Sequence, residues 1–437
     1  MKIAVIGVGY VGLVTGVGLA TIGHQVTCVD VDENKVAQLN EGISPIYEPG
    51  IEKLMIENIN ENKLSFTTSY EKAIAGVDVV YLAVGTPEGD QGQAELKYLK
   101  LAAKQVAECV TNPITLVVKS TVPVGTNREV QNEIQSLTSH SISIVSNPEF
   151  LREGTAVYDI FHGDRIVLGS EDKEALKKLT EINEGFGIPI LITGLESAEM
   201  IKYASNAFLA TKISFINELA NICEATGGDI REVSRGMGMD RRIGAAFLQA
   251  GIGYGGSCFP KDTAALLQIS KKVDIPFEML QEVIHINQRQ RDRFLDKLRS
   301  ELKILTGKKI AVLGLAFKPD TDDIREAPAI YIIQELLKEG AVVTAFDPIA
   351  NNNGIKQFGQ MVTFTDSPEE AFLEADAALI VTEWDEIVQT APNQFKKLMK
   401  QPVVIDGRNS FDEKAMERAG VNYMNVGIGE IKELVLE

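Results

Sequence analysis

Short apolar runs alternate with helical patterns through the first third of the chain. The runs are rich in Val and Ile and carry few charges, which is typical of strands buried on both faces of a parallel sheet. They cover residues 2–7, 25–30, 77–84, 114–118 and 142–145. Because strands that alternate with helices form parallel sheets, this region predicts an α/β fold with a doubly wound sheet.

The middle of the chain has a different pattern. Residues 197–226 show helical periodicity with few helix breakers and predict one long helix. A second helical stretch covers roughly residues 263–305. We expect the long helix to join two domains and to contribute to a contact between subunits.

The opening pattern then returns in the last third of the chain. Residues 309–314 repeat the strand at residues 2–7 almost letter for letter. Two further segments, 340–347 and 375–382, repeat residues 23–30 and 76–83. We therefore expect two Rossmann-like doubly wound parallel-sheet domains joined by a long central helix. The expected regions are a nucleotide-binding domain at 1–196, a central helical and dimerisation region at 197–300, and a C-terminal domain at 301–437.

Composition and charge narrow the class of protein. The chain has 437 residues, of which 45% are hydrophobic and 24% charged, as in ordinary globular proteins. Its net charge of −18 disfavours nucleic acid as a partner, because a protein that binds a polyanion needs a basic surface. The four cysteines are scattered and form no Cys-x-x-Cys pair, which argues against a disulfide framework and a zinc site. We expect a cytoplasmic protein without a metal.

One uncharged segment, Ile3–Gly23, is long enough to cross a membrane. It contains six glycines, and acidic residues follow it closely at Asp30 and Asp32. A single positive residue precedes it, and no clear cleavage site for a signal peptide ends it. We therefore interpret the segment as a strand, a turn and a helix, and expect no contact with a membrane.

A dinucleotide fingerprint occupies this first turn. Gly7, Gly9 and Gly12 follow a predicted strand and open a predicted helix, and Asp30 ends the next strand. Glycines in this order permit a tight turn and let a pyrophosphate approach the N-terminus of the helix. An acid at the position of Asp30 accepts hydrogen bonds from a ribose and repels a 2′-phosphate, which favours NAD over NADP. The same glycines are absent after Gly314, so we expect no second dinucleotide there.

The segment Phe247–Asp262 carries the strongest candidate for catalysis. It places Cys258 between nearby glycines and a Pro-Lys-Asp sequence that predicts the start of a helix. A thiol at a helix N-terminus beside a lysine has a lowered pKa and becomes a nucleophile, and glycines let the backbone approach a ligand. A buried structural cysteine in a glycine-rich turn is the competing interpretation. The fingerprint at the start of the chain favours an oxidoreductase with a covalent step on sulfur.

The chain lacks the residues that other classes of dehydrogenase use for catalysis. None of the tyrosines is followed by a lysine four residues later, the pair that short-chain dehydrogenases use. The four histidines lie in no recognisable motif and have no zinc spacing. Lys202 and Asn206, on the predicted long helix, are four residues apart and share one face, which alone is more typical of a solvated helix surface.

The motifs together resemble the UDP-glucose 6-dehydrogenase family, within the wider group of nucleotide-sugar dehydrogenases. The resemblance spans nearly the whole chain. Its most specific parts are the cysteine segment and Asn147–Gly154, which reads Asn-Pro-Glu-Phe-Leu-Arg-Glu-Gly. The remaining motifs, in chain order, are the glycine fingerprint, Ser120–Thr126, Lys202-x-x-x-Asn206, Phe317-Lys-Pro319 and Asp322-Asp-Ile-Arg325.

The resemblance implies a four-electron oxidation of UDP-glucose to UDP-glucuronate that forms two NADH. It implies that Cys258 attacks an aldehyde intermediate to form a thiohemiacetal, which is oxidised to a thioester and hydrolysed. Lys202 and Asn206 are expected to stabilise the oxyanion. Asp262 and Thr121 are expected to position water, with Asp262 or that water as base, and Glu149 to act as a further acid or base in hydrolysis.

Binding residues are carried over from the same resemblance. The expected substrate contacts are Glu149, Phe150, Leu151, Arg152, Lys202, Asn206, Phe247, Leu248, Gln249, Ala250, Gly251, Gly253, Gly255 and Lys318. The expected cofactor contacts are Gly7, Gly9, Val11, Gly12, Asp30, Lys35, Thr86, Thr121, Glu153, Lys261 and Arg325. Arg242 is expected to reach the substrate of a neighbouring subunit, which implies a homodimer, and the C-terminal domain is expected to bind the UDP-sugar.

Two alternatives stay open. A relative that oxidises another nucleotide sugar, such as UDP-N-acetylmannosamine or GDP-mannose, shares these motifs, although the Phe150–Arg152 segment favours UDP-glucose. A nucleotide-sugar binder without catalysis belongs to a different class of protein. The presence of Cys258, Lys202 and Asp262 disfavours that second alternative.

Overall fold

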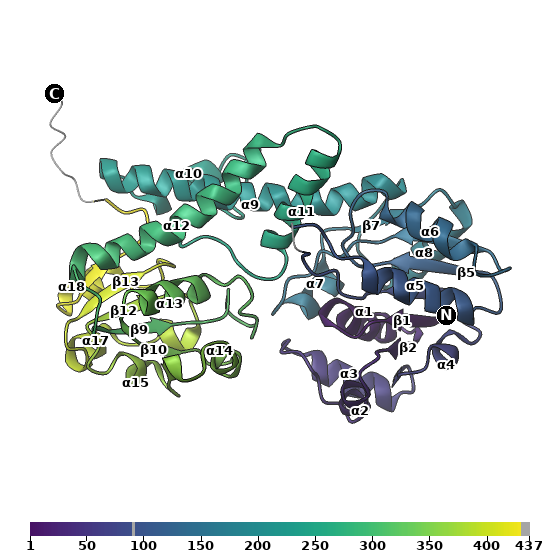
Figure 1. Ribbon diagram of the computed structural model, residues 1–437, viewed down its shortest axis with the longest axis horizontal. Coiled ribbons are helices and arrows are strands. Elements are labelled where there is room, and N and C mark those ends of the chain that lie inside the picture. Colours follow the sequence, from purple (N-terminus) through teal and green to yellow (C-terminus); the bar gives the residue numbers. More distant parts are fainter. Residues whose placement is uncertain (90–91, 430–437) are drawn as a thin grey trace. The chain divides into compact units, whose positions relative to one another are not determined.

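The computed structural model describes residues 1–89 and 92–429. The chain divides into two compact units, each containing one sheet (Figure 1). The first unit comprises Met1–Ser205 and Ala264–Asp274, and the second comprises Asn206–Thr263 and the chain from Ile275 onward. Two of the boundaries between the units fall within helices, namely α9 (Leu195–Thr226) and α11 (Phe259–Lys272).

The first unit contains an eight-stranded sheet in the order β3-β2-β1-β4-β5-β6-β7-β8. Every neighbouring pair is parallel except β6 and β7. The strands are β1 (Lys2–Ile6), β2 (Gln25–Val29), β3 (Leu64–Thr67), β4 (Val79–Leu82), β5 (Ile114–Val118), β6 (Ile142–Ser146), β7 (Ile166–Gly169) and β8 (Ile190–Thr193). Strand order reverses between β1 and β4, which is the point where doubly wound sheets bind ligands.

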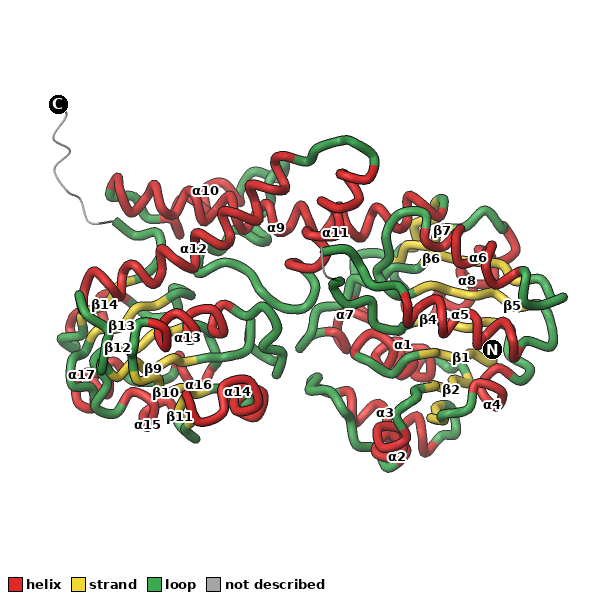
Figure 2. The backbone as a smooth tube through the Cα atoms, in the orientation of Figure 1, coloured by secondary structure: helices red, strands yellow, loops and turns green. Residues whose placement is uncertain are grey.

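Helices cover both faces of this sheet (Figure 2). They are α1 (Tyr10–Thr21), α2 (Glu33–Asn40), α3 (Ile51–Asn60), α4 (Tyr70–Ile74), α5 (Lys97–Cys109), α6 (Thr126–Gln135), α7 (Ala156–His162), α8 (Lys173–Asn183) and the 3-10 helix η1 (Glu184–Phe186). Alternate residues of β1 enter two cores, because successive side chains of a strand point to opposite faces. Ile3 and Val5 pack with α1, α3 and α8, whereas Ala4 and Ile6 pack with α5 and α6.

The second unit repeats the first six strands of this topology. Its sheet has the order β11-β10-β9-β12-β13-β14, and all pairs are parallel. The strands are β9 (Lys309–Leu313), β10 (Val342–Phe346), β11 (Val362–Phe364), β12 (Ala377–Ile380), β13 (Val403–Asp406) and β14 (Asn422–Met424). The predicted fold class, with two parallel sheets and a long helix, is therefore confirmed.

The helices of the second unit include the long α12 (Glu278–Leu302). The others are α10 (Ile230–Gly238), α13 (Pro328–Lys338), α14 (Asn351–Phe358), α15 (Pro368–Phe372), α16 (Asp385–Val388), α17 (Pro392–Leu398), α18 (Glu413–Arg418) and the 3-10 helix η2 (Gly359–Met361). The helical stretch predicted over residues 263–305 consists of two helices, α11 and α12. The interruption contains Asp274 with a φ of 55° and Pro276, which has no backbone N–H to donate.

The segment Ile3–Gly23 forms β1, a turn and α1, as its glycines and flanking charges predicted. Within residues 1–89 and 92–429, we find no helix with the length and apolar character that a membrane crossing requires.

A buried carboxylate organises the carboxyl end of the second sheet. Asp347 follows β10 and is 1% exposed. It accepts hydrogen bonds from the backbone N–H groups of Leu315, Ala316, Ile349 and Ala350 and from the indole of Trp384, at 2.7–3.0 Å. Five donors satisfy the carboxylate within the protein, and each donor would lose a partner without it.

We expect Asp347→Ala to lower the free energy of unfolding by about 3 kcal/mol or more, because it leaves buried donors unpaired. Trp384 is the single tryptophan of the chain, so its fluorescence during denaturation by guanidinium reports on this sheet. Asp366→Ala, at an exposed position, is the control. Equal midpoints for Asp347→Ala and the wild type would contradict this assignment.

Candidate active site

The three glycines of the turn after β1 are required for different structural reasons. Gly7 has a φ of +93°, and a Cβ there would lie 2.9 Å from the carbonyl oxygen of Ala83 in the chain that follows β4. A Cβ on Gly12 would lie 1.8 Å from the carbonyl oxygen of Gly7, so Gly12 permits packing of α1 on the turn. A Cβ on Gly9 would meet no atom within 4 Å. Gly9, the residue before α1, therefore faces open space, as the approach of a pyrophosphate requires.

Asp30, which directly follows β2, is ionised beside this turn. It accepts hydrogen bonds from the backbone N–H of Val8 at 3.0 Å and Asp32 at 3.1 Å, and from the ammonium of Lys35 at 3.1 Å. Burial acts to raise the pKa of Asp30, but these three donors outweigh it and hold the pKa below its ordinary value. A carboxylate can accept further hydrogen bonds, so Asp30 retains the capacity to bind a ribose.

The corresponding acid of the second sheet lacks that capacity. Gly314, with a φ of +97°, follows β9 as Gly7 follows β1, and Asp347 follows β10 as Asp30 follows β2. The five internal donors of Asp347 leave little room for hydroxyl groups of a ligand. This geometry supports the expectation that a dinucleotide binds only at the first turn.

Two loops at the carboxyl edge of the first sheet are tied together. The hydroxyl of Thr86, after β4, donates to the carbonyl oxygen of Thr121, after β5, at 2.9 Å. Ser120 donates to the carbonyl oxygen of Val84 at 2.6 Å. Two residues that we expected near the cofactor thus lie next to each other. Val11, another such residue, lies in the first turn of α1.

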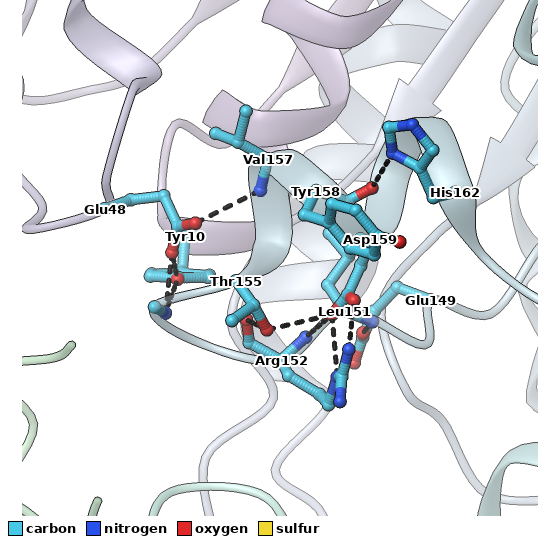
Figure 3. Close-up of polar contacts among 11 residues, drawn as sticks. Tyr10, Glu48, Glu149, Leu151, Arg152, Thr155, Val157, Tyr158, Asp159 and His162 are labelled. Atoms are coloured by element: carbon cyan, nitrogen blue, oxygen red, sulfur yellow. Dashed lines mark hydrogen bonds and ion pairs between the residues drawn. The ribbon is translucent and has the colours of Figure 1, made fainter. Parts of the chain in front are cut away.

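Carboxylates hold the Asn147–Gly154 loop, which follows β6 (Figure 3). Glu149 accepts from the backbone N–H of Leu151 at 2.6 Å. Glu48, which is 5% exposed, accepts from the N–H of Gly154 at 2.7 Å and from the hydroxyl of Tyr10. Because Tyr10 begins α1, these contacts connect the loop to the helix that opens the nucleotide site.

Arg152 of the same loop is engaged by a neighbouring acid. Its guanidinium forms two hydrogen bonds with Asp159 at 2.6 and 3.0 Å, and its backbone N–H donates to the same carboxylate at 2.9 Å (Figure 3). Asp159 is 8% exposed, whereas the side chain of Arg152 is 59% exposed. Arg152 therefore braces the loop, and its expected contact with the substrate stays a prediction.

Glu149 and Lys202 form a buried ion pair. The ammonium of Lys202, on α9, donates to Oε1 of Glu149 at 2.8 Å, and both side chains are nearly inaccessible. Burial acts to raise the pKa of Glu149, but Lys202, the N–H of Leu151 and the charge of Lys119 lower it below the ordinary value. Glu149 is therefore a carboxylate at neutral pH. The pairing of Lys202 decides against a solvated surface for this part of α9.

Two residues of this region were not predicted from the sequence. Lys119 follows β5, donates to Oδ1 of Asn147 at 3.2 Å, and has a pKa lowered to about 8, mainly by burial. The guanidinium of Arg165 lies 3.8 Å from the ring centre of Phe150. Lys119 had a signal, because it stands at the carboxyl end of a strand beside the Ser120–Thr126 motif. Arg165 had none, since a cation–π contact leaves no pattern in a sequence.

A second polar cluster surrounds the start of α11. Asp262 is 1% exposed and accepts from Asn206 of α9 at 2.6 Å and from Lys261 at 2.7 Å. The carbonyl oxygen of Cys258 accepts the N–H of Asp262 at 2.8 Å, so Cys258 immediately precedes the helix, as predicted. Cys258 is half-buried, and its sulfur lies 3.6 Å from the hydroxyl of Ser257.

The glycines before Cys258 make room for protein atoms. A Cβ on Gly251 would lie 2.6 Å from the carbonyl oxygen of Gly407, and one on Gly255 would lie 2.3 Å from that of Glu326. At Gly253 and Gly256 the neighbours are a side-chain oxygen and an aromatic ring. The composition of this loop is thus explained by close packing inside the second unit.

Phe247 begins this loop in a strained conformation. Its φ of 63° lies in the left-handed region, which costs a residue with a side chain about 1–3 kcal/mol. Its ring lies 6.2 Å from that of Phe259, the first residue of α11. Leu248 and Ala250 are buried, whereas Gln249 is exposed. The strain and the ring contact set the path of the chain toward Cys258.

The remaining predicted residues are arranged as follows. Arg242 pairs with Asp240 at 2.6 Å and keeps 83% of its side chain exposed. Arg325 pairs with Asp323 at 2.7 Å. Lys318 lies 5.9 Å from the ring centre of Phe317. Because Thr121 and Glu153 belong to the first unit and Lys261, Asp262 and Arg325 to the second, their expected joint roles stay predictions.

Comparisons with known proteins show the family of this chain. The models of the UDP-glucose/GDP-mannose dehydrogenase family match the NAD binding domain at residues 1–187, the central domain at 196–289 and the UDP binding domain at 311–413. The chain belongs to this family. Its NAD binding domain contains the glycine turn and Asp30, so the chain is an NAD-dependent dehydrogenase.

Several relatives align with nearly the whole length of this chain. UDP-glucose 6-dehydrogenase YwqF of Bacillus subtilis is 51% identical and is covered to 98%, as is this chain. A UDP-glucose dehydrogenase from Pyrobaculum islandicum superposes with a TM-score of 0.92 at 36% identity, covering 98% of this chain and 97% of that one. A UDP-D-ManNAc dehydrogenase from Pyrococcus horikoshii gives 0.87 at 27% identity, covering 98% and 100%.

We expect Lys202→Met to lower the free energy of unfolding at neutral pH by about 3–5 kcal/mol, because it leaves the charge of Glu149 buried and unpaired. In the wild type, the lowered pKa of Glu149 stabilises the folded protein at any pH above the ordinary pKa of a glutamate. This stabilisation is lost as the pH falls through the pKa of Glu149 in the folded protein. In Lys202→Met the pKa of Glu149 rises from its wild-type position, because the ammonium that lowers it most is gone. Acidification should therefore narrow the difference in stability from the wild type.

Thermal unfolding of both proteins at neutral and acidic pH measures this effect. The double variant Lys202→Met/Glu149→Gln is the matched control, because it removes both charges. We expect it to recover part of the lost stability. A difference between Lys202→Met and the wild type that stays constant with pH would contradict the pairing.

Proposed function

We propose that this chain oxidises UDP-glucose to UDP-glucuronate in two steps, with a thioester on Cys258 as the last intermediate. The observation that carries the proposal is the position of Cys258 directly before α11, in the same cluster as the Asn206–Asp262–Lys261 hydrogen bonds. A half-buried thiol at a helix N-terminus is the setting in which a cysteine acts as a nucleophile. The names of the full-length relatives support the choice of substrate.

The steps balance as follows. The C6 alcohol loses a hydride and a proton and becomes an aldehyde. The sulfur of Cys258 adds to this aldehyde to form a thiohemiacetal, whose loss of a second hydride and proton gives a thioester. Water then cleaves the carbon–sulfur bond, which releases the acid and restores the thiol. NAD⁺, when bound at the glycine turn, accepts one hydride in each oxidation.

The chain's own groups supply charge stabilisation and proton transfer. Lys202 and Asn206 are the proposed hydrogen-bond donors to the oxygen that becomes negative at C6. Asp262, with Thr121 positioning a water, is the proposed base. Glu149 is ionised in the free protein, so it suits removal of a proton from the hydrolytic water. Covalent attachment keeps a reactive aldehyde bound while one cofactor replaces another.

Relatives that oxidise other sugars are the main alternative. The UDP-D-ManNAc dehydrogenase from Pyrococcus horikoshii has the same fold at lower identity than the UDP-glucose enzymes from Bacillus subtilis and Pyrobaculum islandicum. The UDP binding domain at residues 311–413 supports a uridine nucleotide over a guanosine one. UDP-glucose is therefore the first substrate to test, with UDP-N-acetylmannosamine and GDP-mannose as comparisons.

A homodimer is part of the proposal. Phe208, Phe215 and Ile222 are spaced seven residues apart on α9, and each side chain is at least half exposed, which gives one helix face an apolar stripe. Exposed apolar side chains that gather on one face are typical of interfaces between proteins. Arg242 is exposed in the single chain and is available to a partner subunit. A second copy of this chain is the proposed occupant of the stripe.

We expect two NADH and one acid for each UDP-glucose when NAD⁺ is in excess and the sugar is limiting. Absorbance of NADH and chromatography of the products measure the ratio. One NADH with free aldehyde would contradict the thioester route. Absence of NADH with UDP-glucose, together with NADH from another nucleotide sugar, would shift the substrate to that sugar.

We expect Cys258→Ser to lose nearly all formation of UDP-glucuronate while it still binds NAD and UDP-glucose, because a hydroxyl is a far weaker nucleophile than a thiolate. Calorimetric titration checks binding separately from activity. Near-normal formation of acid by this variant would overturn the covalent route.

Arg242 is testable by mixing two defective chains. Co-expressed Arg242→Ala and Cys258→Ser chains should together recover up to about a quarter of wild-type activity, because half of the random dimers contain one complete site if Arg242 acts across the interface. Each variant expressed alone is the control. Activity no higher than the sum of the controls would place the arginine in its own subunit or outside the site.

A further inference from the structure

The segment that leads to Cys258 is buried without regular secondary structure. Residues 251–256 are buried and lie in no helix or strand of the described chain. Buried backbone N–H and C=O groups need partners, and a lost partner costs about 1–3 kcal/mol. The partners of this segment therefore determine where it lies, and with it the thiol four residues after Tyr254.

Asn287 of α12 pairs with both backbone polar groups of Tyr254. Its Oδ1 accepts the N–H of Tyr254 at 2.8 Å, and its Nδ2 donates to the carbonyl oxygen of the same residue at 3.0 Å. A Cβ on Gly253 would lie 2.4 Å from Oδ1 of Asn287, so the glycine permits this approach. Asn287 is 5% exposed. One side chain thus holds the loop as the neighbouring strand of a sheet would.

Gln290, one turn further along α12, holds the start of the segment. Its Nε2 donates to the carbonyl oxygen of Gly251 at 2.9 Å, and its Oε1 accepts from Asn221 of α9 at 3.0 Å. The N–H of Gly251 donates to Oδ1 of Asn217, also on α9, at 2.8 Å. Both polar groups of Gly251 are thereby bound by amide side chains that are nearly inaccessible to solvent.

The same segment is bonded to the second sheet's loops. The N–H of Ile252 donates to the carbonyl oxygen of Gly407 at 3.1 Å, and the N–H of Gly256 donates to that of Arg325 at 3.0 Å. Gly407 follows β13. The amides of α9 and α12 therefore hold a segment that is also hydrogen-bonded to the domain at residues 311–413. A displacement of the segment would move the thiol relative to that domain.

We propose that Asn287 and Gln290 are positioning residues, which hold the loop so that the sulfur of Cys258 captures the aldehyde before it leaves. The inference rests on the proposed thiol route. A reacting atom displaced by about 1 Å can lose two orders of magnitude in rate. A misplaced sulfur slows the addition to the aldehyde, while the first oxidation, which does not use the thiol, continues. The released aldehyde is then the signature of a loosened loop.

Asn287→Asp and Gln290→Glu test the proposal. Each substitution keeps the shape and replaces the donating amide with a carboxylate oxygen that faces a carbonyl oxygen. The measured quantity is NADH formed per acid formed in the first turnovers with UDP-glucose. Complete capture gives two. Each escaped aldehyde adds one NADH without acid, so we expect both variants to exceed two, with free aldehyde detected by mass spectrometry.

This ratio is independent of how much enzyme is folded, so lost stability alone leaves it unchanged. Asn183→Asp is the matched control: Asn183 has the same 5% exposure, donates to Leu179 of α8, and lies in the first unit. We expect a ratio of two for this control. If Asn287→Asp does not fold, Gln290→Glu provides the test by itself.

The outcomes separate the two proposals. If Cys258→Ser loses acid formation and both loop variants keep a ratio of two, the positioning role is wrong and the thiol route stands. If Cys258→Ser forms acid at a near-normal rate, the thiol route is wrong and the positioning role falls with it. A ratio above two in the loop variants but not in Asn183→Asp supports the positioning role.

Discussion

Polar groups that are withdrawn from water must find partners inside the protein, and this constraint organises each functional region of the chain. An unpaired buried charge or N–H costs more than its hydrogen bond contributes when made. Glu149 is therefore paired with Lys202, Asp262 with Asn206 and Lys261, and Asp347 with five donors. Glu149, Lys202 and Asp262 among them are also groups to which we assign roles in the proposed chemistry.

The two sheets share one topology but differ around the acid that follows the second strand. Both have a glycine with positive φ after the first strand and an acid after the second. Asp30 can accept further hydrogen bonds, and the space beside Gly9 is open. Asp347 already accepts hydrogen bonds from the loops of its own domain. The two turns therefore differ in how many internal donors the acid already accepts from.

Burial also connects the thiol to distant helices. Residues 251–256 lie in no strand of the part of the chain that the structure describes, and amide side chains of α9 and α12 pair with their backbone instead. Their glycines are explained by this packing, since added Cβ atoms would overlap carbonyl oxygens and Asn287. The glycine-rich sequence beside Cys258, the proposed nucleophile, therefore reflects how the protein packs around this loop.

The sequence by itself determined the fold class, the glycine turn and the start of the helix after Cys258. These depend on apolar periodicity and on residues adjacent in the chain, such as Gly7 with Gly9 or Cys258 with Asp262. It did not predict the short strands β7 and β8 or the break between α11 and α12. The tertiary structure alone decided which charges pair and which amides hold the loop, because Lys202 and Asn287 meet partners 53 and 33 residues away. Such contacts depend on packing of the whole unit, which no local pattern records.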